Sequence, residues 1–113
     1  MTDSNYSYKF LALADSDWTK ILNYIEYELS NPKAAKELAD ELFNKIDNIC
    51  KFPESGARID NKHIKDQTLR KFTAGNYIVF YKPDSELQSI IIMRIIYAGR
   101  ELSGALKSMQ KQY

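Results

Sequence analysis

Residues 69–97 read LRKFTAGNYIVFYKPDSELQSIIIMRIIY, and this pattern predicts most of a β-sheet. A Gly-Asn pair at 75–76 separates two strand-like runs, 69–74 and 77–82, as in a β-hairpin. The Pro, Asp and Ser of the following PDSE segment favour a second turn. The run 89–97 is rich in isoleucine and apolar on both faces except at Arg94. We therefore expect an antiparallel meander whose last strand is central, covered by helices on one face and partly covered on the other.

Two helices are expected before this sheet. Apolar residues recur at helical spacing over 16–29, and Asp15-Ser16-Asp17 supplies capping oxygens at the start. Asn31-Pro32 begins the second helix, because Asn is a good N-cap and Pro suits the first helical position. The apolar stripe of this helix extends to about Lys51, and the segment FPESG ends it. The short connection predicts an antiparallel helical hairpin.

A strand is predicted before the helices and a short helix after the sheet. Tyr6–Leu13 places aromatic residues on alternate positions, and 57–68 has no clear period and is expected to be a loop. Gly99 ends the last strand, and residues from Leu102 to Met109 have helical spacing. The order β-α-α-β-β-β-α predicts one α+β domain over residues 1–113. In it a small, mainly antiparallel sheet is covered on one face by the hairpin, and the first strand pairs with the last.

The net charge of +1 is unevenly distributed along the chain. Residues 1–50 hold five lysines and nine acidic residues, a net charge of −4. Residues 51–113 hold eleven Lys and Arg and six acidic residues, a net charge of +5. The second half should therefore present a basic surface suited to an acidic partner or a nucleic-acid backbone. The positive charge of this surface is smaller than that of a protein whose affinity comes mainly from phosphate contacts.

The composition also argues against several classes of protein. The sequence has no apolar run of membrane-spanning length, and its polar N-terminus is unlike a secretory signal. Its single cysteine, Cys50, fits a reducing cytoplasm and is expected in the core. Its single histidine, His63, is expected to be solvated, and the two residues are too few for a zinc site. Phosphate-loop, dinucleotide and nucleophile-elbow motifs are absent from the sequence. We expect a cytoplasmic protein that needs no cofactor, metal or membrane.

Four cations near the strands are candidate binding residues. Arg70 and Lys71 begin a strand, and Arg100 follows the end of the last one. Arg94 interrupts a run of isoleucines, which leaves two interpretations: a structural arginine bonded to a carboxylate or to backbone carbonyls, or a cation on an exposed face of the sheet. The tyrosines interleaved with these cations are either plain sheet aromatics or platforms for stacking bases: Tyr77, Tyr81 and Tyr97.

Several short motifs follow one another in a fixed order along nearly the whole chain. They are Tyr8-x-Phe10, Ile21-x-x-Tyr24-Ile25, Asn31-Pro32-x-Ala34-Ala35, Phe52-Pro53-Glu54-x-Gly56, Arg70, Asn76-Tyr77-Ile78-Val79-Phe80-Tyr81 and Arg94-Ile95-Ile96-Tyr97-x-Gly99-Arg100-Glu101. In this order the sequence resembles the RelE and ParE superfamily of toxins from bacterial type II toxin–antitoxin modules. The resemblance implies a sheet under a helical hairpin and a cognate antitoxin as partner. It also implies that operator DNA is bound only through that antitoxin.

The superfamily divides by target, and the resemblance favours one branch. RelE-like members cleave messenger RNA in the ribosome, whereas ParE-like members inhibit DNA gyrase. Lys71 and Arg100 match the RelE-like catalytic pattern. Three other positions of that pattern are apolar here: Leu69, Ile78 and Leu106. Losing a single transition-state donor commonly costs ~10²-fold in rate, so the resemblance implies a ParE-like gyrase inhibitor rather than a hydrolase.

The resemblance also implies which residues bind. We expect target or antitoxin contacts at Arg70, Lys71, Arg94, Tyr97 and Arg100, with acidic and apolar groups of the antitoxin meeting the arginines. The alternative is a ribosome-dependent endoribonuclease whose partners are the ribosome and mRNA and whose active centre holds Lys71, Arg100, Arg70 and Tyr97. A third hypothesis is a degenerate toxin that only binds its antitoxin and regulates its operon.

Overall fold

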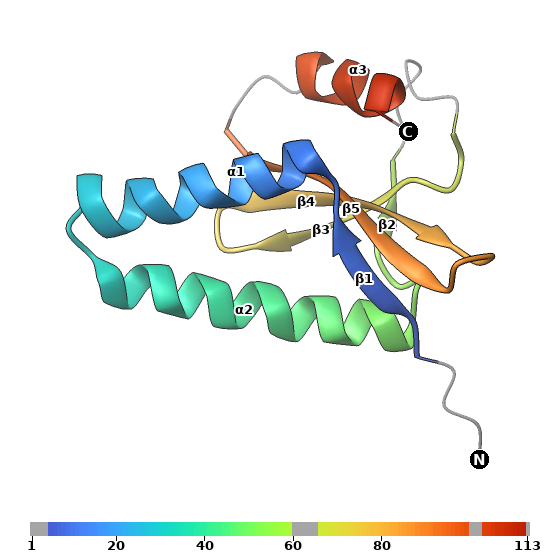
Figure 1. The fold of residues 1–113 in the computed structure, drawn as a ribbon, viewed down its shortest axis with the longest axis horizontal. Helices are drawn as coiled ribbons and strands as arrows, with labels where there is room; N and C mark the ends of the chain where they lie inside the picture. Colours follow the sequence, from blue (N-terminus) through green and yellow to red (C-terminus); the bar gives the residue numbers. More distant parts are fainter. Residues whose placement is uncertain (1–4, 60–65, 100–102, 113) are drawn as a thin grey trace.

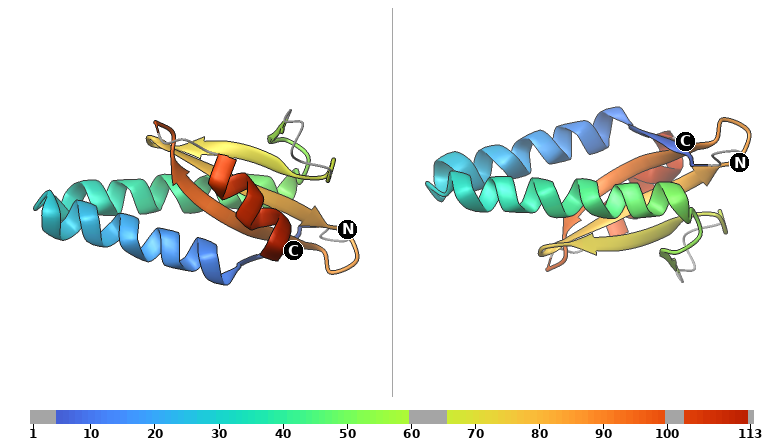
Figure 2. Two further views of the ribbon diagram at one scale, coloured as in Figure 1. Left: turned by 90° about the horizontal axis from the view of Figure 1, so that it is seen from above. Right: turned by 90° about the horizontal axis from the view of Figure 1, so that it is seen from below.

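A five-stranded sheet lies between a helical hairpin and a short helix (Figure 1, Figure 2). The computed structural model describes residues 5–59, 66–99 and 103–112. The strands lie in the order β1-β5-β4-β3-β2, and β1 is parallel to β5 while the other pairs are antiparallel. Their bounds are β1 Ser7–Phe10, β2 Ala57–Arg58, β3 Arg70–Ala74, β4 Tyr77–Asp84 and β5 Ser89–Tyr97. The α+β fold, the hairpin over the sheet and the pairing of first and last strands are confirmed.

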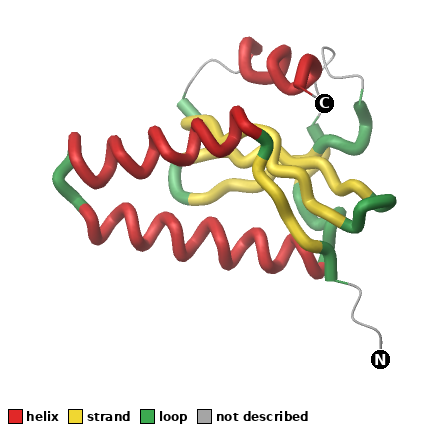
Figure 3. Tube along the Cα trace, in the orientation of Figure 1, coloured by secondary structure: helices red, strands yellow, loops and turns green. Residues whose placement is uncertain are grey.

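The helical hairpin consists of α1 (Ala12–Asn23), a π-helical turn η1 (Tyr24–Glu28) and α2 (Pro32–Lys51), and Figure 3 shows its short connecting loop. The predicted start of α2 is confirmed, because the Asn31 side chain accepts a hydrogen bond from the Ala34 N–H at 3.1 Å. No helix of the described ranges is both long and apolar enough to cross a bilayer.

The predicted start of the first helix is wrong. The helix begins at Ala12 instead of residue 16, and its N-cap, Leu11, makes no side-chain capping bond. The Leu11 N–H donates instead to the Ile92 carbonyl at 3.0 Å, so pairing with β5 carries the chain directly into the helix. Asp15 and Asp17 consequently lie inside α1, where Asp17 has a different role. The first strand likewise ends at Phe10, before the predicted Leu13.

Two predicted loops contain strand residues. The segment 57–68 holds β2, whose Ala57 and Arg58 pair with Lys71 and Arg70 of β3. Strand β4 continues through Pro83, which was expected in a turn and instead lies opposite Ile90. Proline fits there because β3 pairs with β4 only as far as Tyr81, so the missing N–H of Pro83 faces no partner strand.

Alternation along β5 divides the core into two apolar layers. Ile90, Ile92 and Ile95 pack against the helical hairpin. Ile91, Met93 and Ile96 pack on the other face with Leu106 and Met109 of α3 (Ser103–Gln112). Helices therefore cover both faces of β5, more completely than the sequence predicts, because α3 closes the second face.

The predicted core position of Cys50 is confirmed. Burial is the main cause that raises the pKa of its thiol, and the negative charge of Asp47 raises this pKa further.

Candidate partner-binding site

A β-bulge determines where Arg94 points. Tyr81 of β4 lies opposite Ile92, but the preceding Phe80 lies opposite Arg94, so Met93 is an extra residue in β5. Simple alternation would place Arg94 on the face of Ile90 and Ile92, among the apolar side chains that meet the hairpin. The bulge instead places it opposite Phe80, on the side that α3 covers.

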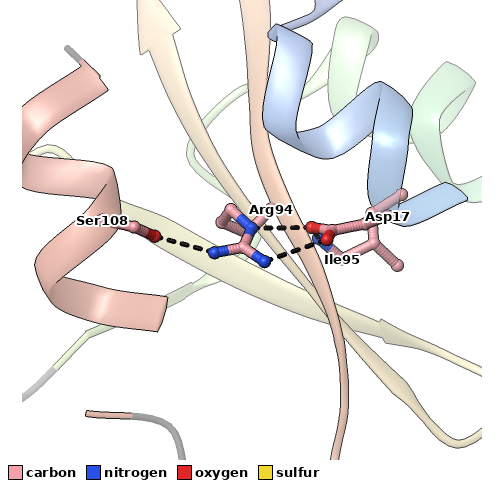
Figure 4. A network of polar contacts seen from close by, with 4 residues as sticks. All are labelled: Asp17, Arg94, Ile95 and Ser108. Carbon is pink, nitrogen blue, oxygen red and sulfur yellow. Dashed lines mark hydrogen bonds and ion pairs between the residues drawn. The ribbon is translucent and has the colours of Figure 1, made fainter. Parts of the chain in front are cut away.

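Arg94 is held between two helices (Figure 4). Its Nε and Nη2 donate to the two carboxylate oxygens of Asp17 in α1, at 2.7 and 2.9 Å, and its Nη1 donates to the Ser108 hydroxyl of α3 at 2.7 Å. Asp17 also accepts the Ile95 N–H at 3.0 Å, at an edge of β5 that β1 no longer covers. The hydrogen bonds that Arg94 donates to Asp17 raise the pKa of Arg94. This 9% exposed residue therefore has the first of its two expected arrangements, bonded to a carboxylate.

Arg70 and Tyr81 fasten the FPESG turn to the sheet. The Tyr81 hydroxyl donates to the Pro53 carbonyl at 2.8 Å and accepts the Gly56 N–H at 2.9 Å. Arg70 donates from Nη1 to the Gly56 carbonyl at 2.8 Å. A Cβ at Gly56 would lie 2.5 Å from the Tyr81 hydroxyl, which explains the glycine. The sequence pattern gave no sign of this network, because its members lie far apart along the chain.

An open pocket of about 880 Å³ lies beside this turn. Its lining includes three cations, Lys51 at the end of α2, Arg58 in β2 and Arg70 in β3, together with the exposed Phe52. Arg58 also donates to the Gln67 side chain at 3.5 Å. We call this site the basic pocket. Lys51, Phe52 and Arg58 were not among the predicted binding residues, and the local excess of cations after Lys51 was the only signal for them.

Lys71 lines a separate groove of about 530 Å³ between α2 and β3. Lys45, on the α2 side of this groove, donates to the Thr73 carbonyl at 2.7 Å and pairs with Glu41 at 3.2 Å. The Gly75 N–H donates to Glu41 at 3.0 Å. This bond is the main cause that lowers the pKa of Glu41, and the hydrogen bond from Lys45 lowers it further. Within the described part of the chain, Lys71 makes no ion pair and remains half-buried.

Tyr97 lies at the far end of the strands from Arg70. It is 54% exposed, lies opposite Tyr77 in the sheet, and packs edge-on against that ring with centroids 5.8 Å apart. Burial is the main cause that raises the pKa of Tyr77. Electrostatic interaction with Tyr24 and Tyr97 raises this pKa further.

The structure does not gather the predicted site residues into one patch. Arg70 lies opposite Tyr81 and Tyr97 opposite Tyr77, so the two are separated by four residues of β4, or roughly 13 Å at the usual rise of a strand. Arg94 is interior, and Lys71 lines its own groove. Arg100 and His63 lie outside the described residues.

A small sheet with a helical hairpin on one face and a short C-terminal helix on the other is the fold of the RelE and ParE toxins. The family model described as the ParE toxin of the type II toxin–antitoxin system parDE matches residues 8–102. The chain therefore belongs to the ParE toxin family.

Two solved structures are similar in fold. One is the RelBE2 toxin–antitoxin complex from Mycobacterium tuberculosis, with 17% identity, a TM-score of 0.56, and coverage of 82% of this chain and 98% of that chain. The other is a chromosomal ParDE toxin–antitoxin system from P. aeruginosa, with 16% identity, a TM-score of 0.62, and coverage of 84% and 98%. No curated protein sequence matches the chain.

Proposed function

We propose that this toxin acts in the cytoplasm by binding and inhibiting DNA gyrase, and that a cognate antitoxin neutralises it. Membership of the ParE toxin family supports the toxin and antitoxin parts of this proposal. The choice of gyrase over the ribosome depends on a further observation, which concerns the face of the sheet beneath α3.

The three apolar positions that depart from the ribonuclease pattern pack into one layer. Leu69 and Leu106 are 4% and 5% exposed, and Ile78 packs against the cluster that contains them. A hydrolytic site needs donors that face the developing charge of the transition state. The three positions that the resemblance aligns with such donors hold apolar side chains here, in a cluster that also contains Met109 of α3. This apolar layer is the observation that carries the proposal.

The geometry also disfavours the ribonuclease alternative. Arg70 and Tyr97 would have to converge on one phosphodiester with Lys71, yet they lie at opposite ends of the strands. Arg70 is moreover bonded to the Gly56 carbonyl, which fixes its guanidinium beside the basic pocket. Binding at separate points suits contact with a large partner surface better than chemistry on a single group.

Among the expected contact residues, Lys71 and Tyr97 are the best placed to touch gyrase. Tyr97 is 54% exposed, and Lys71, although half-buried, makes no ion pair with a residue that the structure describes. Arg94 acts through the position of β5 instead of through contact, because its side chain is interior. Arg70 is assigned to the basic pocket, and Arg100 stays an expected contact on the strength of the family resemblance.

A supercoiling assay with purified gyrase tests this proposal. The full chain should inhibit supercoiling, and Lys71→Ala with Tyr97→Ala should weaken inhibition about tenfold or more, because truncating central contact residues of an interface commonly has such an effect. Lys36→Ala is the matched control: Lys36 is exposed on α2 and paired only with Asp40 there.

Three outcomes would overturn the assignment. Unimpaired supercoiling at high toxin excess removes gyrase as the target. Site-specific cleavage of messenger RNA on purified ribosomes, abolished by Lys71→Ala, establishes the ribonuclease alternative. Normal growth of cells that express the toxin without antitoxin indicates a degenerate toxin.

A further inference from the structure

We propose that the tip of the helical hairpin docks into an apolar pocket of gyrase whose rim carries positive charge. This inference rests on the proposed inhibition of gyrase, and it assigns that contact a surface and a chemistry. The tip is formed by η1 and the short connection to α2. We define the tip surface by five side chains: Tyr24, Glu26, Tyr27, Glu28 and Leu29.

Three large apolar side chains are exposed on the tip surface. Tyr24, Tyr27 and Leu29 are 52%, 69% and 54% exposed. Figure 1 and Figure 2 show that the hairpin extends beyond the end of the sheet here, so the tip protrudes from the molecule. Exposed apolar side chains gathered in one place commonly mark a surface that another molecule covers. A protruding tip of this kind is suited to enter a pocket of a partner.

The π-helical turn explains why Leu29 is exposed. The apolar stripe of the first helix predicts Leu29 on the buried side, one turn after Ile25. In the structure Ile25 is buried, whereas the Leu29 N–H donates to the Tyr24 carbonyl at 3.0 Å, five residues back. This wider turn carries Leu29 away from the core. Turns of this kind are rare and occur frequently at functional sites, which supports an interaction at the tip.

The charge of the tip surface indicates the chemistry of its partner. Residues 21–32 hold two glutamates, Glu26 and Glu28, and no lysine or arginine. Neither glutamate forms an ion pair with a residue that the structure describes. The complement of this surface is therefore a pocket with a positively charged rim. An enzyme that holds DNA presents positive side chains to the phosphates, so such a rim is expected of gyrase.

The tip surface lies beside the tyrosine pair that includes the proposed gyrase contact Tyr97. The rings of Tyr77 and Tyr97 pack edge-on with centroids 5.8 Å apart. Burial is the main cause that raises the pKa of Tyr77, and electrostatic interaction with Tyr24 raises it further, which requires these two side chains to be near each other. One face of gyrase can therefore contact both Tyr97 and the tip. Tyrosine suits such an interface, because its ring is buried while its hydroxyl keeps a hydrogen bond.

Inhibition of gyrase supercoiling by the full chain tests the inference, with binding to immobilised gyrase measured alongside. Tyr27→Ser with Leu29→Ser should raise the toxin concentration for half-maximal inhibition about tenfold or more, because two apolar anchors are lost. Leu13→Ser with Leu87→Ser is the matched control. These two side chains are also exposed but lie outside the tip, so inhibition should be unchanged.

A second pair of variants tests the charge of the tip. Glu26→Gln with Glu28→Gln should weaken binding to gyrase about threefold to tenfold at low salt, since two partly exposed ion pairs are lost. Asp47→Asn with Glu86→Gln removes the same charge from exposed positions outside the tip and should leave binding unchanged. All four double variants should keep the circular dichroism spectrum of the wild type, because the substituted side chains lie on the surface.

The inference is wrong if the folded Tyr27→Ser/Leu29→Ser variant inhibits gyrase as strongly as its control. Inhibition by the wild type would then keep gyrase as the target and place the contact elsewhere. A Glu26→Gln/Glu28→Gln variant that binds like the wild type overturns the positively charged rim. A wild type that neither binds nor inhibits gyrase refutes the proposed function and the inference with it. Tip-dependent dimers in analytical ultracentrifugation, with unchanged inhibition, would assign the tip surface to a second copy of the chain.

Discussion

At the scale of single residues, Arg94 shows how a charge is accommodated inside an isoleucine-rich strand. An isolated buried charge is very costly, but Arg94 donates three hydrogen bonds to Asp17 and Ser108, which satisfy most of its guanidinium. Asp17 in turn accepts the backbone N–H of Ile95. The Asp17 carboxylate therefore also accepts a backbone hydrogen bond of β5 beyond the point where its pairing with β1 ends.

Asp17→Ala should destabilise the fold strongly, by about 3 kcal/mol, because it leaves the mostly buried Arg94 charge and the Ile95 N–H without their partner. Urea unfolding measured by circular dichroism gives the free energy of unfolding. Asp40→Ala, which breaks only the exposed pair with Lys36, should cost less than about 1 kcal/mol. Equal losses for the two variants would show that the buried pair contributes no more than a surface pair.

Tyr81→Phe should destabilise the protein by about 1–3 kcal/mol at neutral pH, because the Pro53 carbonyl and the Gly56 N–H lose their partner. Burial, opposed by the Gly56 bond and the Arg70 charge, raises the pKa of Tyr81. A phenol whose folded pKa is raised contributes stability below its unfolded pKa of about 10, and this stability is lost as the pH rises towards the folded pKa.

The difference between wild type and Tyr81→Phe should therefore narrow above about pH 10. Urea unfolding at a series of alkaline pH values measures it, with Tyr27→Phe at an exposed position as the control. A constant difference across that range would contradict a raised Tyr81 pKa.

At the scale of elements, α3 completes the second layer of the core. Leu106 and Met109 of this helix are 5% and 1% exposed, and they cover Phe80, Ile91 and Ile96 of the sheet. The helix is further attached by the bond from Arg94 to Ser108. A ten-residue helix is marginal alone, so its stability here comes from this packing.

Met109→Ala should cost about 2–4 kcal/mol, because it removes most of a fully buried side chain and leaves a cavity against the sheet. Lys107→Ala on the exposed side of the same helix is the control and should be nearly neutral. Thermal unfolding compares the two, and binding of a hydrophobic dye reports whether the apolar layer becomes exposed. A loss below about 1 kcal/mol for Met109→Ala would mean that α3 adds little to the folded state.

At the scale of the whole molecule, the basic pocket and the tyrosine pair lie at opposite ends of the strands. Lys51 at the end of α2 lines the pocket, whereas Tyr77 and Tyr97 pair beside the turn that joins β3 to β4. Figure 1 shows that the end of α2 and this turn lie at opposite ends of the sheet. The protein therefore presents a cationic surface at one end of the strands and an aromatic surface at the other end. The two surfaces can contact different partners.

Binding of a short synthetic peptide of alternating glutamate and leucine at the basic pocket should weaken steadily as the salt concentration rises, because the Debye length falls from about 10 Å at 0.1 M to about 3 Å at 1 M and the attraction between partly exposed charges is screened accordingly. The Lys51→Ser/Arg58→Ser variant should show a flatter dependence. Titrations at several salt concentrations measure both slopes. Identical slopes would assign the salt effect to the overall field of the protein instead of the pocket.

The sequence alone determined the helical hairpin, the meander and the fold class. Local signals carry these features: the Asn31-Pro32 cap, the Gly75 turn and the helical and strand periods of the apolar residues. The beginning of α1 was missed because a distant strand, through the bond from Leu11 to Ile92, sets it more strongly than the nearby aspartates do.

Only the tertiary structure decided how the charged residues are used. Arg94 is a structural residue because a single extra residue in β5 turns it towards Asp17 and Ser108. The basic pocket brings together Lys51, Arg58 and Arg70, which belong to three different elements. Neither result has a local sequence signal. Periodicity reports which face a residue occupies within one element, whereas pairing and pockets depend on contacts between residues far apart in the chain.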